Sequence, residues 1–236
     1  MSGVVGPRPE SIFNRFSFEF DGTDDGITCV ADSTINPISA ITVSLWVNGT
    51  IGGAGASTSR LFGRRFFYVE HTSVNRIRCR IFQSAGSFQT LETGVVNIYD
   101  DNWHHVLVSY NIPGNSAKIY LDNNLLVNTT VTMSTFLNSS QPIGIGTNYL
   151  GNALFFNGKI DEPAYWHNTD QSSNYSTIWN NGTPNDLSDL QPSFWLRMGD
   201  KAIWNGSRWT LPQQGFSVED GVSSGMDENN RVLDTP

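Results

Sequence analysis

The feature of the sequence that most constrains the fold is the segment Asn102–Val127. Its side chains alternate with a period of two along Val106–Asn111 and again along Ala117–Asp122, which is typical of antiparallel strands with one face in a core. Between the two runs, Pro113–Asn115 favours a turn, because proline fixes φ and glycine tolerates positive φ. The segment therefore predicts a β-hairpin, since an amphipathic helix has a longer apolar period and no central Pro-Gly.

Similar short runs lie on both sides of this hairpin and are separated by turns rich in Gly, Asn, Asp and Pro. Leu61–Glu70 and Arg76–Phe82, for example, are expected to pair as a second hairpin. One short helix is expected over Ser172–Asn180, whose bulky residues have helical spacing and which Gly182 follows as a terminator. About twelve short strands with so little helix predict an all-β fold, a sandwich or jelly roll of antiparallel strands.

The 236 residues suffice for a single all-β domain, and we expect three parts. Residues Met1–Asn14 contain several glycines and prolines and are expected to be an N-terminal arm, disordered or docked on a neighbouring subunit. The alternating runs place the jelly roll at residues 15–198. Gly199–Pro236 is polar and poorly periodic apart from a small hairpin expected at Trp204–Trp209. It is expected to be a C-terminal extension that lies on the domain or reaches to a partner.

The net charge of −8 makes duplex nucleic acid a poor partner, because phosphates are bound by clusters of Lys and Arg. The local basic concentration of the chain lies between Arg60 and Arg80. Arg76, Arg78 and Arg80 share the parity of one strand face, and two interpretations stay open. The face is either simply solvated or forms a strip that contacts anions.

Targeting and redox signals are weak in this chain. No apolar run approaches the roughly 20 residues of a membrane span, and the N-terminal residues have no apolar core of a secretory signal peptide. Cys29 and Cys79 do not form a disulfide framework and are expected to be buried, reduced thiols.

Four segments, in order, resemble strands of laminin-G-like, concanavalin A-like jelly-roll domains of the pentraxin type. They are Phe18–Asp25 (FEFDGTDD), Thr42–Val47 (TVSLWV), Asn102–Asn124 and Asn157–Glu162 (NGKIDE). With the short helix that follows them, they extend the resemblance from Asn14 to Met198. The resemblance implies two antiparallel sheets packed face to face.

Two further segments, Phe194–Asp200 and Gly225–Pro236, resemble segments that accompany this domain in structural proteins of tailed bacteriophages. This implies a virion protein, made in the host cytoplasm, that decorates a capsid or tail. It would contact other virion proteins or copies of itself through the N-terminal arm and the C-terminal extension, and would present an adhesive surface for cell-surface glycans. The alternative is a stand-alone carbohydrate-binding module.

Calcium is the cofactor that the resemblance implies, because acidic loop residues converge in such domains. Asp21, Asp24 and Asp25, with Asp161 from a late strand, are the candidate ligands, since Ca²⁺ prefers carboxylate, carbonyl and amide oxygens. In the alternative interpretation Asp21 and Asp24 cap the turn with their own hydrogen bonds, and Asp161 accepts from a buried donor.

Sugar binding needs exposed aromatic rings, which stack on sugar faces. The candidates are Tyr149, Trp166, Trp204 and Trp209, and the alternative interpretation for each ring is packing in the core. An enzyme is not expected. A glycosidase needs two carboxylates that flank the bond, and the adjacent Asp161 and Glu162 are expected to point to opposite faces of a strand.

Overall fold

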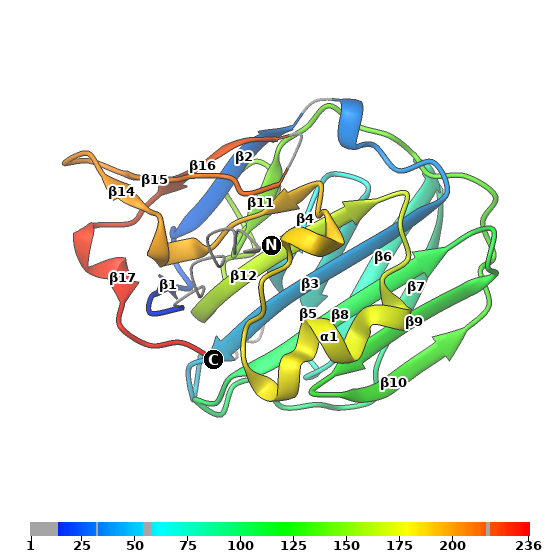
Figure 1. Ribbon diagram of the computed structural model, residues 1–236, viewed down its shortest axis with the longest axis horizontal. Coiled ribbons are helices and arrows are strands. Elements are labelled where there is room, and N and C mark those ends of the chain that lie inside the picture. The colour runs from blue at the N-terminus through cyan, green and yellow to red at the C-terminus, as the bar shows by residue number, and fades with distance from the viewer. Residues whose placement is uncertain (1–13, 32, 54–57, 216–217) are drawn as a thin grey trace, which may run out of the picture.

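The computed structural model describes residues 14–31, 33–53, 58–215 and 218–236. They form two antiparallel sheets packed face to face, so the predicted all-β jelly-roll sandwich is confirmed (Figure 1). The first sheet has the order β10 (Asn124–Thr129), β9 (Ser116–Leu121), β8 (His104–Asn111), β3 (Ala40–Gly49), β12 (Asn157–His167), β1 (Ser17–Asp21) and β17 (Arg231–Val232), with β13 (Phe194–Trp195) also paired to β12.

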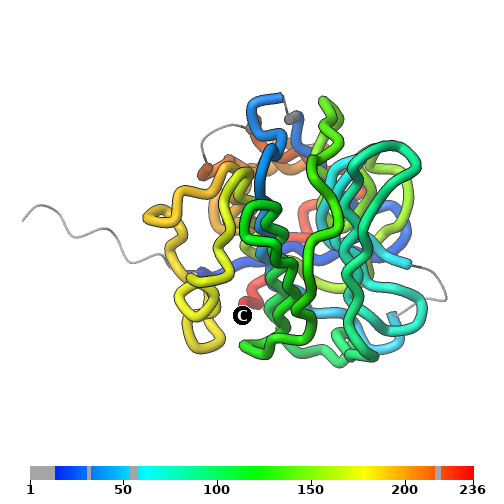
Figure 2. The backbone as a smooth tube through the Cα atoms, turned by 90° about the vertical axis from the view of Figure 1, so that its right-hand side faces the viewer, coloured from blue at the N-terminus to red at the C-terminus, as the bar shows by residue number. Residues whose placement is uncertain are grey.

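The second sheet has the order β14 (Ile203–Trp204), β15 (Trp209–Leu211), β16 (Val218–Ser224), β2 (Gly26–Ala31), β11 (Ile143–Ile145), β4 (Ser59–Gly63), β5 (Phe67–His71), β6 (Ile77–Ser84) and β7 (Ser87–Glu92). Its strands form the layer behind β3 and β12 in Figure 1, and Figure 2 shows the two layers from the side. The main apolar core lies between the layers.

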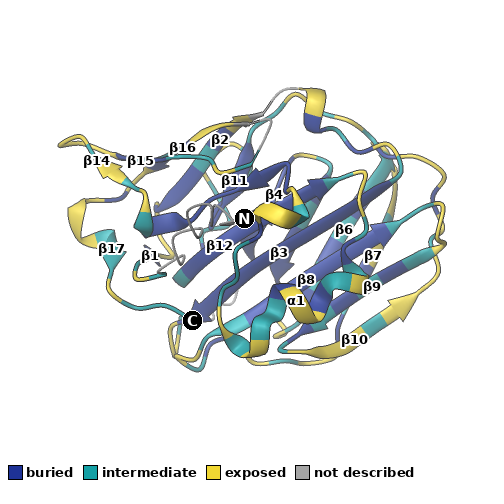
Figure 3. Cartoon of the chain, in the orientation of Figure 1, coloured by how far each residue is buried: buried dark blue, intermediate teal, exposed yellow. Residues whose placement is uncertain are grey.

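The predicted central hairpin is confirmed as β8 and β9, which pair from Val106 opposite Leu121 to Asn111 opposite Ser116. Both faces of β8 are buried, as the dark strands at the centre of Figure 3 show. One face packs between the sheets. The other face carries Leu107, which packs in a second, smaller cluster with Tyr175 and Ile178 of α1 (Tyr175–Trp179). The hairpin is therefore the centre of the scaffold.

The helix predicted over Ser172–Asn180 is confirmed as a 3₁₀ turn, Ser172–Asn174, that continues into α1. It ends at Asn180 rather than at Gly182, because Asn180 adopts the left-handed conformation with φ of 45°. The predicted second hairpin differs in detail. Leu61–Glu70 is itself two paired strands, β4 and β5, and β5 then pairs with β6.

The C-terminal residues supply strands to both sheets. The hairpin predicted at Trp204–Trp209 is confirmed as β14 and β15, and β15 continues into β16, which pairs with β2. β17 pairs with β1 at the edge of the first sheet. Trp209 and Leu211 belong to the main core. The segment that we expected to be an extension thus lies on the domain, and the sandwich continues beyond residue 198.

The expected N-terminal arm lies outside the described residues except for Asn14. Its amide Nδ2 donates to Asp161 Oδ2 over 2.7 Å. The thiols of Cys29 and Cys79 are free and buried, as predicted. Within the described residues no helix is long and apolar enough to cross a membrane.

Candidate functional site

The acidic turn Asp21–Gly26 joins β1 to β2 and holds its own conformation through Asp21. The Asp21 Oδ1 accepts hydrogen bonds from the backbone N–H groups of Thr23 at 2.7 Å and Asp24 at 3.2 Å. Gly22 has a φ of 76°, and a Cβ added there would lie 2.8 Å from the Cβ of Asn157, so the turn packs closely on the start of β12. The predicted capping role of Asp21 is therefore confirmed.

Asp25 is the buried member of this turn. Its Oδ2 accepts from the backbone N–H of Asp21 at 3.0 Å and from Nδ2 of Asn230 at 2.8 Å. Burial, together with repulsion from Asp21, raises the pKa of Asp25 to about 6. The turn therefore concentrates negative charge, and among the described residues it forms no ion pair with a Lys or Arg side chain.

The C-terminal turn Glu228–Asn230 closes over β1. It begins with a capping box, in which the Asp227 carboxylate accepts from the N–H of Asn229 and the Asn230 side chain accepts from the N–H of Asp227. Asn230 Nδ2 also donates to the backbone oxygen of Glu19 at 2.9 Å. The side chain of Asn230 thus connects the C-terminal turn to β1 and to Asp25 of the acidic turn.

A pocket of about 340 Å³ lies between these two turns and the beginning of β12. It is lined by Glu19, Phe20, Asp21, Thr50, Asn157, Asp227, Asn229 and Asn230. Carboxylate, amide and hydroxyl groups provide most of the lining side chains, and such groups can donate to and accept from several hydroxyls at once. Most of the side chains around this pocket are therefore polar, and Phe20 is the apolar exception.

Three of the four predicted calcium ligands lie together in the turn. Asp21, Asp24 and Asp25 each offer a carboxylate oxygen, and these oxygens all lie within 4.8 Å of one another. No hydrogen bond from the described residues reaches Oδ2 of Asp21 or Oδ1 of Asp25. Oxygens that the turn does not use thus remain for a hard cation, and oxygen ligands of this kind suit Ca²⁺.

Asp161 does not join this group. It is fully buried, with 0% of its surface exposed, on the outer side of β12. It accepts from the side chain of Asn14 at 2.7 Å and from the backbone N–H of Glu162 at 2.9 Å. The prediction of Asp161 as a calcium ligand beside the turn is wrong, whereas the alternative, a partner of a buried donor, is confirmed.

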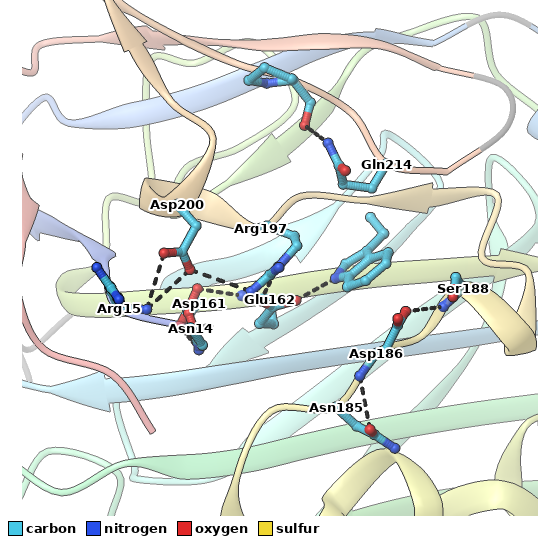
Figure 4. A network of polar contacts seen from close by, with 12 residues as sticks. Asn14, Arg15, Asp161, Glu162, Asn185, Asp186, Ser188, Arg197, Asp200 and Gln214 are labelled. Carbon is cyan, nitrogen blue, oxygen red and sulfur yellow. Dashed lines mark hydrogen bonds and ion pairs between the residues drawn. The ribbon is translucent and has the colours of Figure 1, made fainter. Parts of the chain in front are cut away.

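Glu162 lies beside Asp161 in the same buried network, which Figure 4 shows in detail. The Glu162 carboxylate accepts from Nε1 of Trp195 and from Nε of Arg197 at 3.1 Å. Arg197 also lies 3.6 Å from Oδ2 of Asp200, and both carboxylate oxygens of Asp200 accept from the backbone N–H of Arg15. Burial raises the pKa of Glu162 to about 7, and burial together with repulsion from Glu162 raises the pKa of Asp161 well above its usual value.

A bulge in β12 brings the two carboxylates into one network. Ile160 and Tyr165 both face the main core although they are five positions apart, which a regular period-two strand does not allow. The pairing with β3 shifts register between Asp161 and Ala164, and Glu162 has a φ of 49°. The expectation that Asp161 and Glu162 point to opposite faces is therefore wrong.

The four predicted aromatic ligand-binding residues do not gather at one place. Trp166 is 1% exposed and donates from Nε1 to the Leu190 oxygen, and Trp209 is 5% exposed and donates to the Asp227 oxygen. Both rings are packed in cores, so neither can stack on a sugar and both predictions are wrong. Tyr149 and Trp204 are half-buried, do not line the pocket, and stay predictions.

Four residues that complete the pocket were not predicted from the sequence: Asn157, Asp227, Asn229 and Asn230. Asn157 lies at the start of a segment recognised as a strand, and nothing in that segment marked it as a pocket residue. The signal for the others was the spacing of Asp227 and Asn230, which fits a capping box. No regular helix follows this capping box, so the segment has no repeating apolar pattern from which its position in the fold could be predicted.

A comparison with family models places the chain in a known class. The chain belongs to the concanavalin A-like lectin/glucanases superfamily, whose laminin-G-type family model matches residues 21–174, more than half of the sequence. A comparison with curated protein sequences found no match.

Solved structures share this fold at low sequence identity. A Bacteroides ovatus protein, provisionally named a carbohydrate binding protein, superposes with a TM-score of 0.71 at 14% identity over 94% of this chain. The chain spans 60% of the length of that protein. A heptameric SAP-like pentraxin from Limulus polyphemus gives 0.53 at 13% identity, over 70% of this chain and 82% of the pentraxin. The binding domain of Paraclostridial Mosquitocidal Protein 1 gives 0.53 at 12% identity, over 78% and 46%.

Proposed function

We propose that the chain is a non-catalytic carbohydrate-binding module that binds glycan hydroxyls in the pocket between β1, β12 and the C-terminal turn. The observation that carries the proposal is the lining of that pocket. Its amide and carboxylate groups come from three separate parts of the chain and converge on a space of about 340 Å³. The superfamily to which the chain belongs, and the name given to the B. ovatus protein, support the same class of ligand.

The burial of the acidic pair supports a module without hydrolytic activity. A glycosidase needs two carboxylates that reach a bound glycosidic bond from either side. Asp161 is 0% and Glu162 is 3% exposed, and their oxygens accept hydrogen bonds from Asn14, Trp195 and Arg197. The two carboxyl groups therefore serve the packing of residues 195–200 on the sheet rather than a substrate.

We also propose that the acidic turn holds calcium. The residues fit this ion, because three carboxylates lie close together and no cationic side chain among the described residues neutralises them. Asp21, Asp24 and Asp25 would hold the ion, and the bound ion would supply positive charge beside the pocket that Asp21 lines. The side chains of Asn157 and Asn229 would orient the glycan by donating to and accepting from its hydroxyls.

Calcium binding is expected to weaken in acid. Because the pKa of Asp25 is about 6, this carboxylate takes up a proton below that pH, and the proton competes with the ion. The apparent Kd for Ca²⁺ is expected to rise by up to about tenfold per pH unit between about pH 6 and about pH 5, and to be nearly constant above about pH 7. Calorimetric titration across this range measures the effect. A flat pH profile, or a profile that Asp25→Asn leaves unchanged, contradicts the proposal.

A glycan array probed with the purified protein tests the proposed function. In calcium the protein is expected to bind a restricted set of glycans, and in EDTA the signal is expected to fall because the acidic turn loses its cation. Equal binding in both buffers removes the calcium part of the proposal only. A blank array in calcium and in EDTA contradicts carbohydrate binding itself.

The finer proposal is that a phage particle carries this module on its capsid or tail. It is supported by the resemblance of residues 194–200 and 225–236 to segments of phage structural proteins. In that C-terminal region Ile203 and Leu233 are exposed apolar side chains, which a neighbouring virion protein could cover. Mass spectrometry of purified virions tests this assignment, and absence of the protein from the particles contradicts it.

A further inference from the structure

The outer face of β5, β6 and β7 carries a lattice of aromatic and arginine side chains. In Figure 2 these cyan-to-teal strands form the side of the molecule opposite the yellow helical segment, and in Figure 1 they lie at the other end from β1. Alternate residues face outward, so that Tyr68 lies opposite Arg80, and Phe82 lies opposite Phe88. We call the residues Arg65, Phe66, Tyr68, Arg80, Phe82 and Phe88 the aromatic–arginine face.

The rings of this face form a continuous series. The ring centroids of Phe66 and Phe82 are 6.0 Å apart, those of Tyr68 and Phe82 are 6.0 Å apart, and those of Phe82 and Phe88 are 5.1 Å apart. The side chain of Phe88 is 47% exposed, whereas the alternate residues Ile81 and Leu91 are buried between the sheets. The ring of Phe88 is therefore accessible to a ligand that presents a flat apolar surface, and the half-buried ring of Phe82 lies beside it.

Two guanidinium groups in the series lack a carboxylate partner among the described residues. The neighbouring Arg60, Arg76 and Arg78 form ion pairs with Glu70 and Glu92. Arg65 and Arg80 form none, and they lie over aromatic rings instead, at 5.0 Å from the centroid of Phe66 and 5.2 Å from that of Phe88.

Arg80 can donate a further hydrogen bond, because its Nε is buried and has no hydrogen-bond partner within the described chain. This local excess of positive charge contrasts with the net charge of −8 of the whole chain. The two unpaired guanidinium groups therefore form a local positive site on an acidic protein.

Aromatic rings beside unpaired arginines favour a ligand that has both flat apolar faces and negative charge. Aromatic rings stack on the apolar faces of pyranose rings, and a guanidinium group pairs with a carboxylate through two parallel hydrogen bonds. The two unpaired arginines are separated by the ring series, so the surface suits a ligand with spaced rather than continuous negative charge. A polynucleotide carries a phosphate at every unit, and the acidic chain as a whole repels it.

We propose that the aromatic–arginine face is a second glycan-binding site, which takes a saccharide that contains uronic acid residues. The sugar rings lie on Phe82 and Phe88, and a uronate carboxylate accepts hydrogen bonds from the guanidinium group of Arg80. Of the three arginines that share the parity of one strand face, Arg76 and Arg78 form ion pairs with Glu92 and Glu70, so within the described residues Arg80 is the one left for contact with an anion. The site is far from the acidic pocket and needs no calcium.

The test is a titration of the full chain, in EDTA, with a short hyaluronan oligosaccharide, which has one uronate per disaccharide. The carboxyl-reduced form of the same oligosaccharide is the neutral control. We expect binding of the uronate form, weakened by salt, and a Kd for the neutral form that is higher by about tenfold or more, because a charge-assisted pair is lost. Comparable loss is expected for Arg80→Gln and for Phe88→Ala.

Matched variants separate this site from general effects. Arg208→Gln removes an exposed arginine from the β14–β15 turn, and Leu125→Ala removes an exposed apolar side chain from β10, so both are expected to keep full affinity. All four variants are expected to keep the thermal unfolding midpoint within a few degrees, because the altered side chains reach solvent.

Several results overturn the proposal. They are no binding of the uronate form, equal binding of the neutral form, unchanged affinity of Arg80→Gln, or tighter binding of single-stranded oligonucleotide than of hyaluronan. Asn229→Ala, in the acidic pocket, is expected to leave this titration unchanged. Absence of hyaluronan binding therefore does not contradict glycan binding in the acidic pocket. Absence of glycan binding in the pocket likewise does not contradict binding at the aromatic–arginine face.

Discussion

Replacing Arg197 with methionine is expected to lower the free energy of unfolding by about 3–5 kcal/mol near neutral pH, because a buried ion pair then loses its cation. Arg197 is 6% exposed and donates to Glu162, and it also lies near Asp200. Methionine fills a similar volume but leaves the buried carboxylates of Asp161 and Glu162, and the half-buried carboxylate of Asp200, without that charge. Urea denaturation of wild type and variant measures the difference.

The cost of this substitution is expected to depend on pH. Burial raises the folded-state pKa of Glu162 to about 7, so the folded protein holds a proton that the unfolded chain loses at lower pH. The contribution of Glu162 to stability is therefore complete below its unfolded pKa and declines as the pH rises toward about 7. Without Arg197 the ionised form is harder to bury, so the variant is expected to lose more stability at about pH 8 than at about pH 5.

Arg208→Met provides the control for this experiment. Arg208 is exposed in the turn between β14 and β15 and forms no ion pair with the described residues, so its loss is expected to change stability by less than about 0.5 kcal/mol. An Arg197→Met variant that unfolds like wild type, or that is destabilised equally at every pH, contradicts the account of the buried network.

Ending the chain after Met198 is expected to abolish cooperative folding. The removed residues include Trp209 and Leu211, which are buried in the main core, and they include β16 and β17, which pair with β2 and β1. Loss of one large buried side chain already costs about 3–5 kcal/mol, against a total stability of about 5–15 kcal/mol for a typical domain. Two unpaired strand edges and an exposed core surface add to this loss.

Near-ultraviolet circular dichroism and urea unfolding of the truncated chain measure the outcome. A chain that ends at Asp234 retains all the strands and the Asp234 contacts with Trp103 and Lys159, and is expected to unfold like the full chain. If the chain that ends at Met198 unfolds cooperatively with an unchanged midpoint, residues 199–236 are an appendage and not part of the sandwich.

The regular alternation of apolar and polar residues along a strand explains which parts of the fold could be predicted from the sequence. The β8–β9 hairpin is evident because its residues alternate without interruption on both sides of a Pro-Gly turn. β16 has no such pattern, because its segment Val218–Ser224 is mostly polar. Its position is determined by pairing with β2, nearly two hundred residues away, and a local pattern carries no information on such a partner.

The candidate site was partly predictable for the same reason. Asp21, Asp24 and Asp25 are close in sequence, so the turn alone brings them together. Asp161 was wrongly added, because the bulge after it and its bond to Asn14 are properties of the folded sheet. The packing of Trp166 and Trp209 likewise depends on segments that lie far away in the sequence.

The pocket between the acidic turn and the C-terminal turn is proposed to bind glycan. The most direct test is calorimetric titration, in calcium, of the strongest glycan from the array into wild type and Asn229→Ala, since Asn229 lines the pocket with an exposed side chain. Asn138→Ala, an exposed asparagine elsewhere, is the control. Asn229→Ala is expected to raise the Kd by about tenfold, whereas Asn138→Ala is expected to leave it unchanged. Equal affinity of all three proteins would show that the glycan binds elsewhere and would contradict the claim.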